Sequence, residues 1–120
     1  MEIRRILFLL RQPPYATGHA LEALESILVA GVFEQQVSVL FRDDGVWQLL
    51  KGQNGGALGA RTVGNVVQAL PEYEVKDIYV CAESLAERGL VVDDLVLTVK
   101  VLSQREQLTL ISAQQAVVND

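Results

Sequence analysis

The chain of 120 residues contains one cysteine, one histidine and three prolines, and these low counts exclude several classes of protein. A single thiol, Cys81, can form neither an intramolecular disulfide nor a cysteine-based metal cluster, which is typical of a reducing compartment. One cysteine and one histidine also disfavour a zinc site. We therefore expect no metal and no cofactor.

Long hydrophobic runs are also missing. The apolar run at residues 6–10 is too short for the core of a signal peptide and far below the roughly 20 residues that cross a bilayer. We therefore expect a cytoplasmic protein. Basic residues are outnumbered 10 to 15 by acidic ones, and a net charge of −5 disfavours binding to the phosphates of nucleic acid.

Apolar residues, by contrast, are plentiful. They make up 50% of the chain, enough for a compact core, and the mean hydropathy of +0.25 suggests apolar surface buried against another chain. The aromatic residues are scattered, with no basic patch between them, so a nucleic-acid stacking platform is not predicted. Trp47 can serve as an anchor either in the core or at an interface.

Strand-like and helix-like segments alternate along the chain. The expected strands are residues 6–10, 37–41, 77–80, a part of 95–102, and 116–118. The expected helices lie between Thr17 and Gly31, at 46–50, and at 61–70, 84–88 and 104–111. Candidate caps and stop signals are Thr17, Gly31, Pro71, Gly89 and Ser103.

This alternation predicts one α/β domain over residues 1–120. Parallel strands need crossover connections, which helices supply. We expect a mostly parallel sheet of about five strands flanked by helices, Rossmann-like or flavodoxin-like, with the first strand at the centre.

Cys81 is the candidate catalytic residue. We expect it at the carboxyl end of the third strand, directly before a helix, and sites in open α/β sheets form at that edge. A helix N-terminus favours the thiolate, which can accept a sulfane sulfur and carry it as a persulfide. The alternative is a buried cysteine that packs as a small apolar residue.

The other polar motifs favour structural roles. His19 can assist proton transfer, but no serine-centred nucleophile motif accompanies it, so a solvated residue in the first turn of a helix is preferred. Asp43 and Asp44 could hold a divalent cation. Paired acids before glycine are more typical of a turn. The glycine-rich residues 52–59 match neither a P-loop nor the G-x-G-x-x-G spacing, so nucleotide binding is not predicted.

Four segments together resemble the TusC/DsrF family of DsrE-like sulfur-relay proteins. The most specific spans residues 41–53, which read Phe-Arg-Asp-Asp-Gly-Val-Trp-Gln-Leu-Leu-Lys-Gly-Gln. The family pattern there is an aromatic strand end, then Asp-Gly-Val-aromatic-Gln-Leu, then Gly-Gln. The other segments are Ala16-Thr17 with Glu22-Ala23-Leu24, then Tyr73-Glu74-Val75 leading to Ile78-Tyr79-Val80-Cys81, and finally Ser84-Leu85 with Arg88-Gly89-Leu90.

The resemblance implies a Rossmann-like fold and a place in a complex. Relatives assemble with homologous TusB/DsrH-type and TusD/DsrE-type partners into a dimer of trimers. In the Tus branch, the complex receives sulfur from TusA and passes it to TusE, towards the 2-thio group of a wobble uridine in tRNA. The Dsr branch serves sulfur oxidation. The persulfide cysteine of TusD/DsrE-type relatives lies in the segment that matches Cys81, whereas this chain resembles the TusC/DsrF type.

Three hypotheses follow. In the first, the chain is a non-catalytic subunit of a TusBCD-like relay complex that shapes the acceptor surface and touches neither nucleic acid nor membrane. In the second, Cys81 itself carries persulfide; a Dsr-type subunit of a sulfur-oxidation complex is the variant on the other branch. In the third, the chain is a flavodoxin-like nucleotide- or flavin-binding module, a hypothesis that has only fold analogy behind it.

Overall fold

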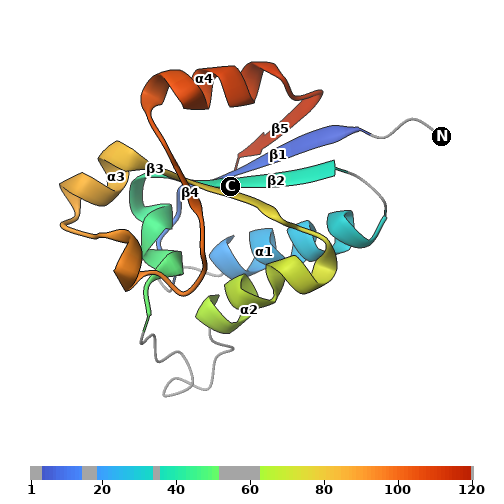
Figure 1. The fold of residues 1–120 in the computed structure, drawn as a ribbon. Helices are drawn as coiled ribbons and strands as arrows, with labels where there is room; N and C mark the ends of the chain where they lie inside the picture. Colours follow the sequence, from blue (N-terminus) through green and yellow to red (C-terminus); the bar gives the residue numbers. More distant parts are fainter. Residues whose placement is uncertain (1–3, 15–18, 34–35, 52–62, 120) are drawn as a thin grey trace.

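A five-stranded parallel sheet forms the centre of the protein in the computed structural model, which describes residues 4–14, 19–33, 36–51 and 63–119. Every neighbouring pair of strands is parallel, so the predicted α/β class is confirmed (Figure 1). The strands are β1 (Arg5–Leu10), β2 (Gln36–Phe41), β3 (Asp77–Cys81), β4 (Lys100–Leu102) and β5 (Ala116–Asn119).

The order of the strands is β4-β3-β2-β1-β5, which differs from the predicted order. The expected central position of the first strand is wrong, because β2 lies at the centre and β1 lies next to the edge strand β5. The chain adds β2, β3 and β4 on one side of β1 and then returns to place β5 on the other side. Buried parallel strands share one apolar pattern, so the sequence does not reveal their lateral neighbours.

Helices cover the two faces of this sheet unequally (Figure 1). Two of them, α1 and α2, lie on one face, α4 lies alone on the other, and α3 follows β3 at the carboxyl edge. The α-helices are α1 (His19–Val32), α2 (Val63–Ala69), α3 (Ala82–Glu87) and α4 (Gln104–Ser112). The 3-10 helices are η1 (Asp43–Leu49), η3 (Leu70–Tyr73) and η4 (Val92–Asp94).

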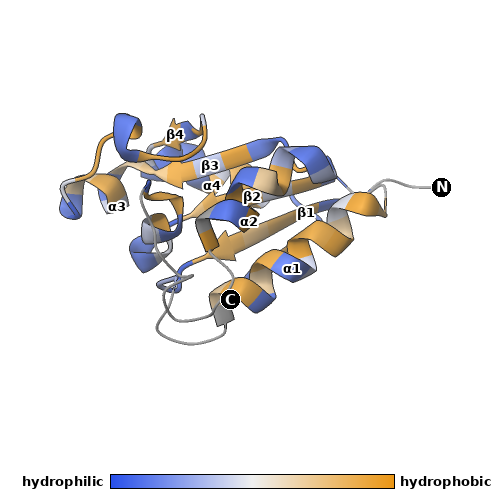
Figure 2. Cartoon of the chain, turned by 90° about the horizontal axis from the view of Figure 1, so that it is seen from below, coloured by the Kyte–Doolittle hydropathy of each residue, from blue (hydrophilic) through white to orange (hydrophobic). Residues whose placement is uncertain are grey.

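The apolar core is divided by the sheet into a large and a small part. The large part lies under α1 and α2 and includes Phe8, Val39 and Phe41. The small part consists of Leu7, Leu9 and Leu40, with partly buried residues of α4 packed against it. Figure 2, which looks onto the α1 and α2 side, shows mostly hydrophobic strands behind helices in which hydrophobic and hydrophilic positions are mixed. Burial under α1 and α2 therefore supplies most of the hydrophobic stabilisation.

Several helix ends differ from those predicted. Gly31 lies within α1 instead of ending it. A Cβ at this position would overlap the carbonyl oxygen of Tyr73, so glycine is the residue that allows α1 to approach η3 closely. Pro71 lies in η3, after α2 has already ended. The predicted N-cap Ser103 is confirmed: its hydroxyl accepts from the N–H of Glu106 at 3.2 Å, and its own N–H donates to the Glu106 carboxylate at 3.0 Å.

A close backbone contact at Gly45 generates the first prediction. A Cβ at Gly45 would overlap the carbonyl oxygen of Leu10, at the end of β1, so one of the two backbones must move. We expect Gly45→Ala to lower the free energy of unfolding by about 3 kcal/mol. At the control position Gly89, φ is +67° but nothing lies within 4 Å of an added Cβ, so Gly89→Ala should cost about 1 kcal/mol. Urea denaturation measures both, and equal losses would contradict the close contact.

Candidate functional site

Cys81 ends β3 and is the N-cap of α3, so it lies at the carboxyl edge of the sheet as predicted. Its register partner on β4 is Leu102, and residues in register point to the same face. That face is the one covered by α4, since Tyr79, two residues earlier on β3, packs against the small core there. Cys81 as a whole residue has a relative exposure of 6%. The thiol is thus enclosed by β3, α3 and α4.

Hydrogen-bond donors from two helices surround the Cys81 sulfur. Burial raises the pKa of the Cys81 thiol, whereas hydrogen bonds from the hydroxyl and N–H of Ser84, the side-chain amide of Gln107 and the N–H of Glu83 lower it. The hydrogen bonds outweigh burial, so the pKa lies below the ordinary value of a cysteine. Because the thiolate is the nucleophile, this environment favours the reactive form.

Ser84 connects this thiol to the turn that follows β2. Its side chain is buried, and its Oγ accepts a hydrogen bond from the main-chain N–H of Asp43 at 2.9 Å. Because the hydroxyl accepts there, its own proton remains for the Cys81 sulfur. Asp43 has a φ of +52°, which a residue other than glycine rarely adopts. The turn after β2 therefore takes part in orienting the donor beside Cys81.

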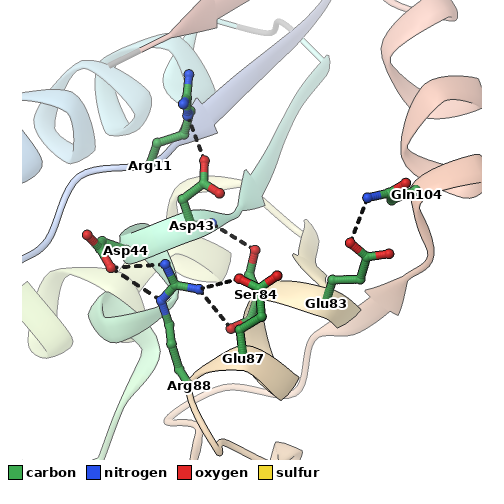
Figure 3. A network of polar contacts seen from close by, with 8 residues as sticks. All are labelled: Arg11, Asp43, Asp44, Glu83, Ser84, Glu87, Arg88 and Gln104. Atoms are coloured by element: carbon green, nitrogen blue, oxygen red, sulfur yellow. Dashed lines mark hydrogen bonds and ion pairs between the residues drawn. The ribbon is translucent and has the colours of Figure 1, made fainter.

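The carboxylates of Asp43 and Asp44 are engaged by arginines (Figure 3). Arg11 Nε donates to Asp43 at 2.9 Å, and Arg88 donates to one oxygen of Asp44 from Nε at 3.2 Å and from Nη2 at 3.0 Å. Among the described residues, no three His, Cys, Asp or Glu side chains gather where they could hold a metal ion. Both acids open the 3-10 helix η1, whereas a turn was expected from the sequence at this place.

Arg88 and Gln48 hold the loops around the cysteine together. The Arg88 side chain is only 18% exposed, and its Nη1 also donates to the carbonyl oxygen of Ser84 at 3.1 Å. Arg88 thereby joins α3 to the Asp44 turn. Gln48 is fully buried, and its Nε2 donates to the carbonyl oxygen of Gln12 at 2.9 Å, which holds the segment after β1 against η1. The segments at the carboxyl edge of the sheet are therefore held together by side-chain hydrogen bonds and ion pairs.

Ser84 and Gln107 are not among the site residues expected from the sequence. A signal existed for Ser84, because it lies three residues after Cys81 and so returns to the first turn of the helix that Cys81 caps. No local signal existed for Gln107. It is buried on α4, where its Nε2 also donates to the carbonyl oxygen of Leu102 at 3.2 Å, and its approach to Cys81 depends on how α4 crosses the sheet.

The remaining candidates contribute less to the site. His19 is the first residue of α1, but its side chain lies outside the described part of the chain, as do Thr17 and the glycine-rich residues 52–59. Trp47 is partly buried in η1, so its use as an anchor stays a prediction. In the described residues, each helix is too short or too polar to cross a membrane.

The chain is similar to a protein family, to individual proteins of known sequence and to a solved structure. The DsrE/DsrF-like family matches residues 4–119. The chain is 45% identical over 94 residues to the intracellular sulfur oxidation protein DsrF of Allochromatium vinosum, covering 78% of this chain and 69% of that protein. It is 39% identical over 113 residues to a TusC homologue of Pseudomonas aeruginosa, covering 94% and 95%.

A solved structure extends the comparison to the fold. The crystal structure of the ychN protein from E. coli superposes with a TM-score of 0.87 and covers 98% of this chain and 100% of that one. The two sequences are 17% identical, so this likeness concerns the fold alone.

The hydrogen bond from Ser84 generates a prediction about the thiol. Ser84→Ala removes the hydroxyl donor, so we expect the pKa of the Cys81 thiol to rise and its titration to move to higher pH. Thiolate absorbance followed against pH in the folded protein measures the shift. Ser26→Ala is the matched control, because that hydroxyl donates to the main-chain carbonyl oxygen of Glu22 on the surface of α1. Identical titrations of Ser84→Ala and wild type would contradict the described donor.

Proposed function

Because the chain belongs to the DsrE/DsrF-like family, we propose that it works as one subunit of a multi-subunit sulfur-relay complex. The observation that carries the proposal is the 39% identity to a TusC homologue over 94% of this chain. On the Tus branch, which we favour, such a complex passes persulfide sulfur towards 2-thiolation of the wobble uridine in tRNA.

The alternative branch has support of its own. Identity to the DsrF protein is higher, at 45%, but the match covers 78% of this chain and 69% of that protein. The TusC homologue is matched over 95% of its length. We choose the Tus branch on this end-to-end agreement and keep a Dsr-type subunit of a sulfur-oxidation complex as the alternative.

The partners that we propose are homologous TusB/DsrH-type and TusD/DsrE-type subunits, arranged as a dimer of trimers. The net charge of −5 supports a role away from the RNA itself, because a chain that grips phosphates needs an excess of basic residues. We place the complex in the cytoplasm, where it would meet its sulfur donor and acceptor proteins.

The role proposed for this chain is structural, shaping the surface on which sulfur is handed over. Its carboxyl edge supports that role, since ion pairs and buried amides tie its loops together. Beside the paired acids lies a polar hollow of about 370 Å³, lined by Arg11, Gln12, Pro13, Asp43 and Asp44. Side chains already held by ion pairs lose little conformational freedom when a partner docks, so such a surface binds at low entropic cost.

Assembly tests the proposal. We expect the chain, co-expressed with the two sister subunits from the same genome, to elute with both in one species of fixed stoichiometry on size-exclusion chromatography. Light scattering should give the mass of a dimer of trimers. A monodisperse monomer in the presence of both sister subunits would exclude the proposed role.

A second candidate function, persulfide transfer by Cys81 itself, has the lowered thiol pKa in its favour. In that step the Cys81 thiolate attacks the outer sulfur of a donor persulfide. A new S–S bond forms at Cys81, the donor S–S bond breaks, and the donor leaves as a thiolate. The hydrogen bonds from Ser84 and Gln107 would stabilise the attacking sulfur before the transfer.

Intact mass separates the two roles of Cys81. If Cys81 carries sulfur, incubation with a sulfane-sulfur donor adds the mass of one sulfur atom to the protein, and Cys81→Ser shows no addition. Reduction with a thiol should remove the added mass. A wild-type protein that gains no mass, and whose thiol also resists alkylation while folded, has a structural cysteine.

A further inference from the structure

The two edges of the sheet differ in how they are protected. The edge strand β4 carries Lys100, a charged residue of the kind that discourages pairing with another chain. The other edge strand, β5, contains no charged residue and no proline. Val117 and Val118 in β5 are 37% and 43% exposed. An unpaired apolar edge of this kind is a ready template for a further strand.

An apolar groove lies beside this edge on the α1 face. Val118 is in register with Phe8 of β1 and so points towards the same face, whereas Val117 is in register with Leu7 and points to the α4 face. The groove has a volume of about 360 Å³, and its apolar lining is Phe8, Leu10, Ala23 and Val118. Among the described residues, no helix covers the α1 face of β5, so the groove is open to solvent there.

We infer that a strand of a partner subunit pairs with the outer edge of β5 and places its apolar side chains in this groove. A strand added about 4.8 Å from β5 satisfies the outward N–H and C=O groups of the edge. Its alternate side chains fall on the α1 face, over the groove, and on the α4 face, beside Val117. A helix laid over the groove would cover Val118 but leave the backbone edge of β5 open.

The charge at the groove indicates what kind of strand fits. Glu22 of α1 is the one charged residue among those that line the groove, and Asn119 lies at the same end. A strand with a lysine or arginine opposite Glu22 complements this lining. A second copy that pairs through its own β5 brings no basic residue to Glu22, because β5 has none. We therefore assign the groove to a different chain, and pairing with a second copy is an outcome of the test.

This inference rests on the proposed function, because it requires a partner subunit. The test uses the complex with the two sister subunits and follows hydrogen–deuterium exchange of the β5 amides. We expect these amides to exchange more slowly in the complex than in the isolated chain. If the complex forms and β5 exchanges equally fast in both, the inference is wrong while the proposed function stands. Failure of the wild type to form any complex overturns both.

Two substitutions test separately whether assembly depends on the apolar lining of the groove and on the charge of Glu22. Val118→Asp should weaken assembly by about tenfold or more, because a second negative charge is forced against an apolar lining that already holds Glu22. Glu22→Lys should also weaken assembly, by opposing the partner's basic residue. The controls Leu108→Asp and Glu72→Lys introduce the same charges at exposed positions of α4 and η3, and both should assemble as wild type does. Equal effects of test and control variants contradict the inference.

Self-association is the remaining outcome to be measured. If the isolated chain forms dimers in which the β5 amides are protected, the occupant is a second copy, and the inference of a different partner is overturned. Sedimentation of the isolated chain at several concentrations, with circular dichroism to confirm that each variant is folded, gives this result.

Discussion

The hydrogen bond from the main-chain N–H of Asp43 to the hydroxyl of Ser84 is the interaction on which the carboxyl edge depends. It joins the turn after β2 to the helix after β3, two segments that meet only because their strands are parallel neighbours. The same hydroxyl then donates to Cys81. Gly45, pressed against the end of β1, fixes where that turn lies. The position of the segment after β2 therefore affects the pKa of the Cys81 thiol, because both depend on the Ser84 hydroxyl.

Uneven covering of the sheet is the second organising feature. Two helices and most of the apolar core occupy one face, and a single helix covers the other. The return of the chain from β4 to β5 leaves the last strand at an edge with exposed valines. A chain that kept such an edge bare would be prone to pair with others. The partner strand that we propose would cover this edge.

The sequence contained enough information for the elements of the fold and too little for their arrangement. Continuous apolar runs identified the strands, because both faces of a parallel sheet are buried. The position of Cys81 followed from the end of its run and from the helix after it. The strand order could not be predicted in this way. Gly31 was expected to end a helix, but it lies within α1 and allows close packing against Tyr73. Gln107 reaches Cys81 from a distant helix, a contact that only tertiary structure reveals.

We propose that this chain is a subunit of a sulfur relay that feeds tRNA thiolation. The most direct test of that role is the 2-thiouridine content of tRNA from cells that lack the chain, measured by mass spectrometry of digested nucleosides. If the chain serves this relay, the 2-thio group at the wobble uridine is lost in these cells and returns when the wild-type chain is supplied. Undiminished 2-thiouridine in the deleted cells would contradict it.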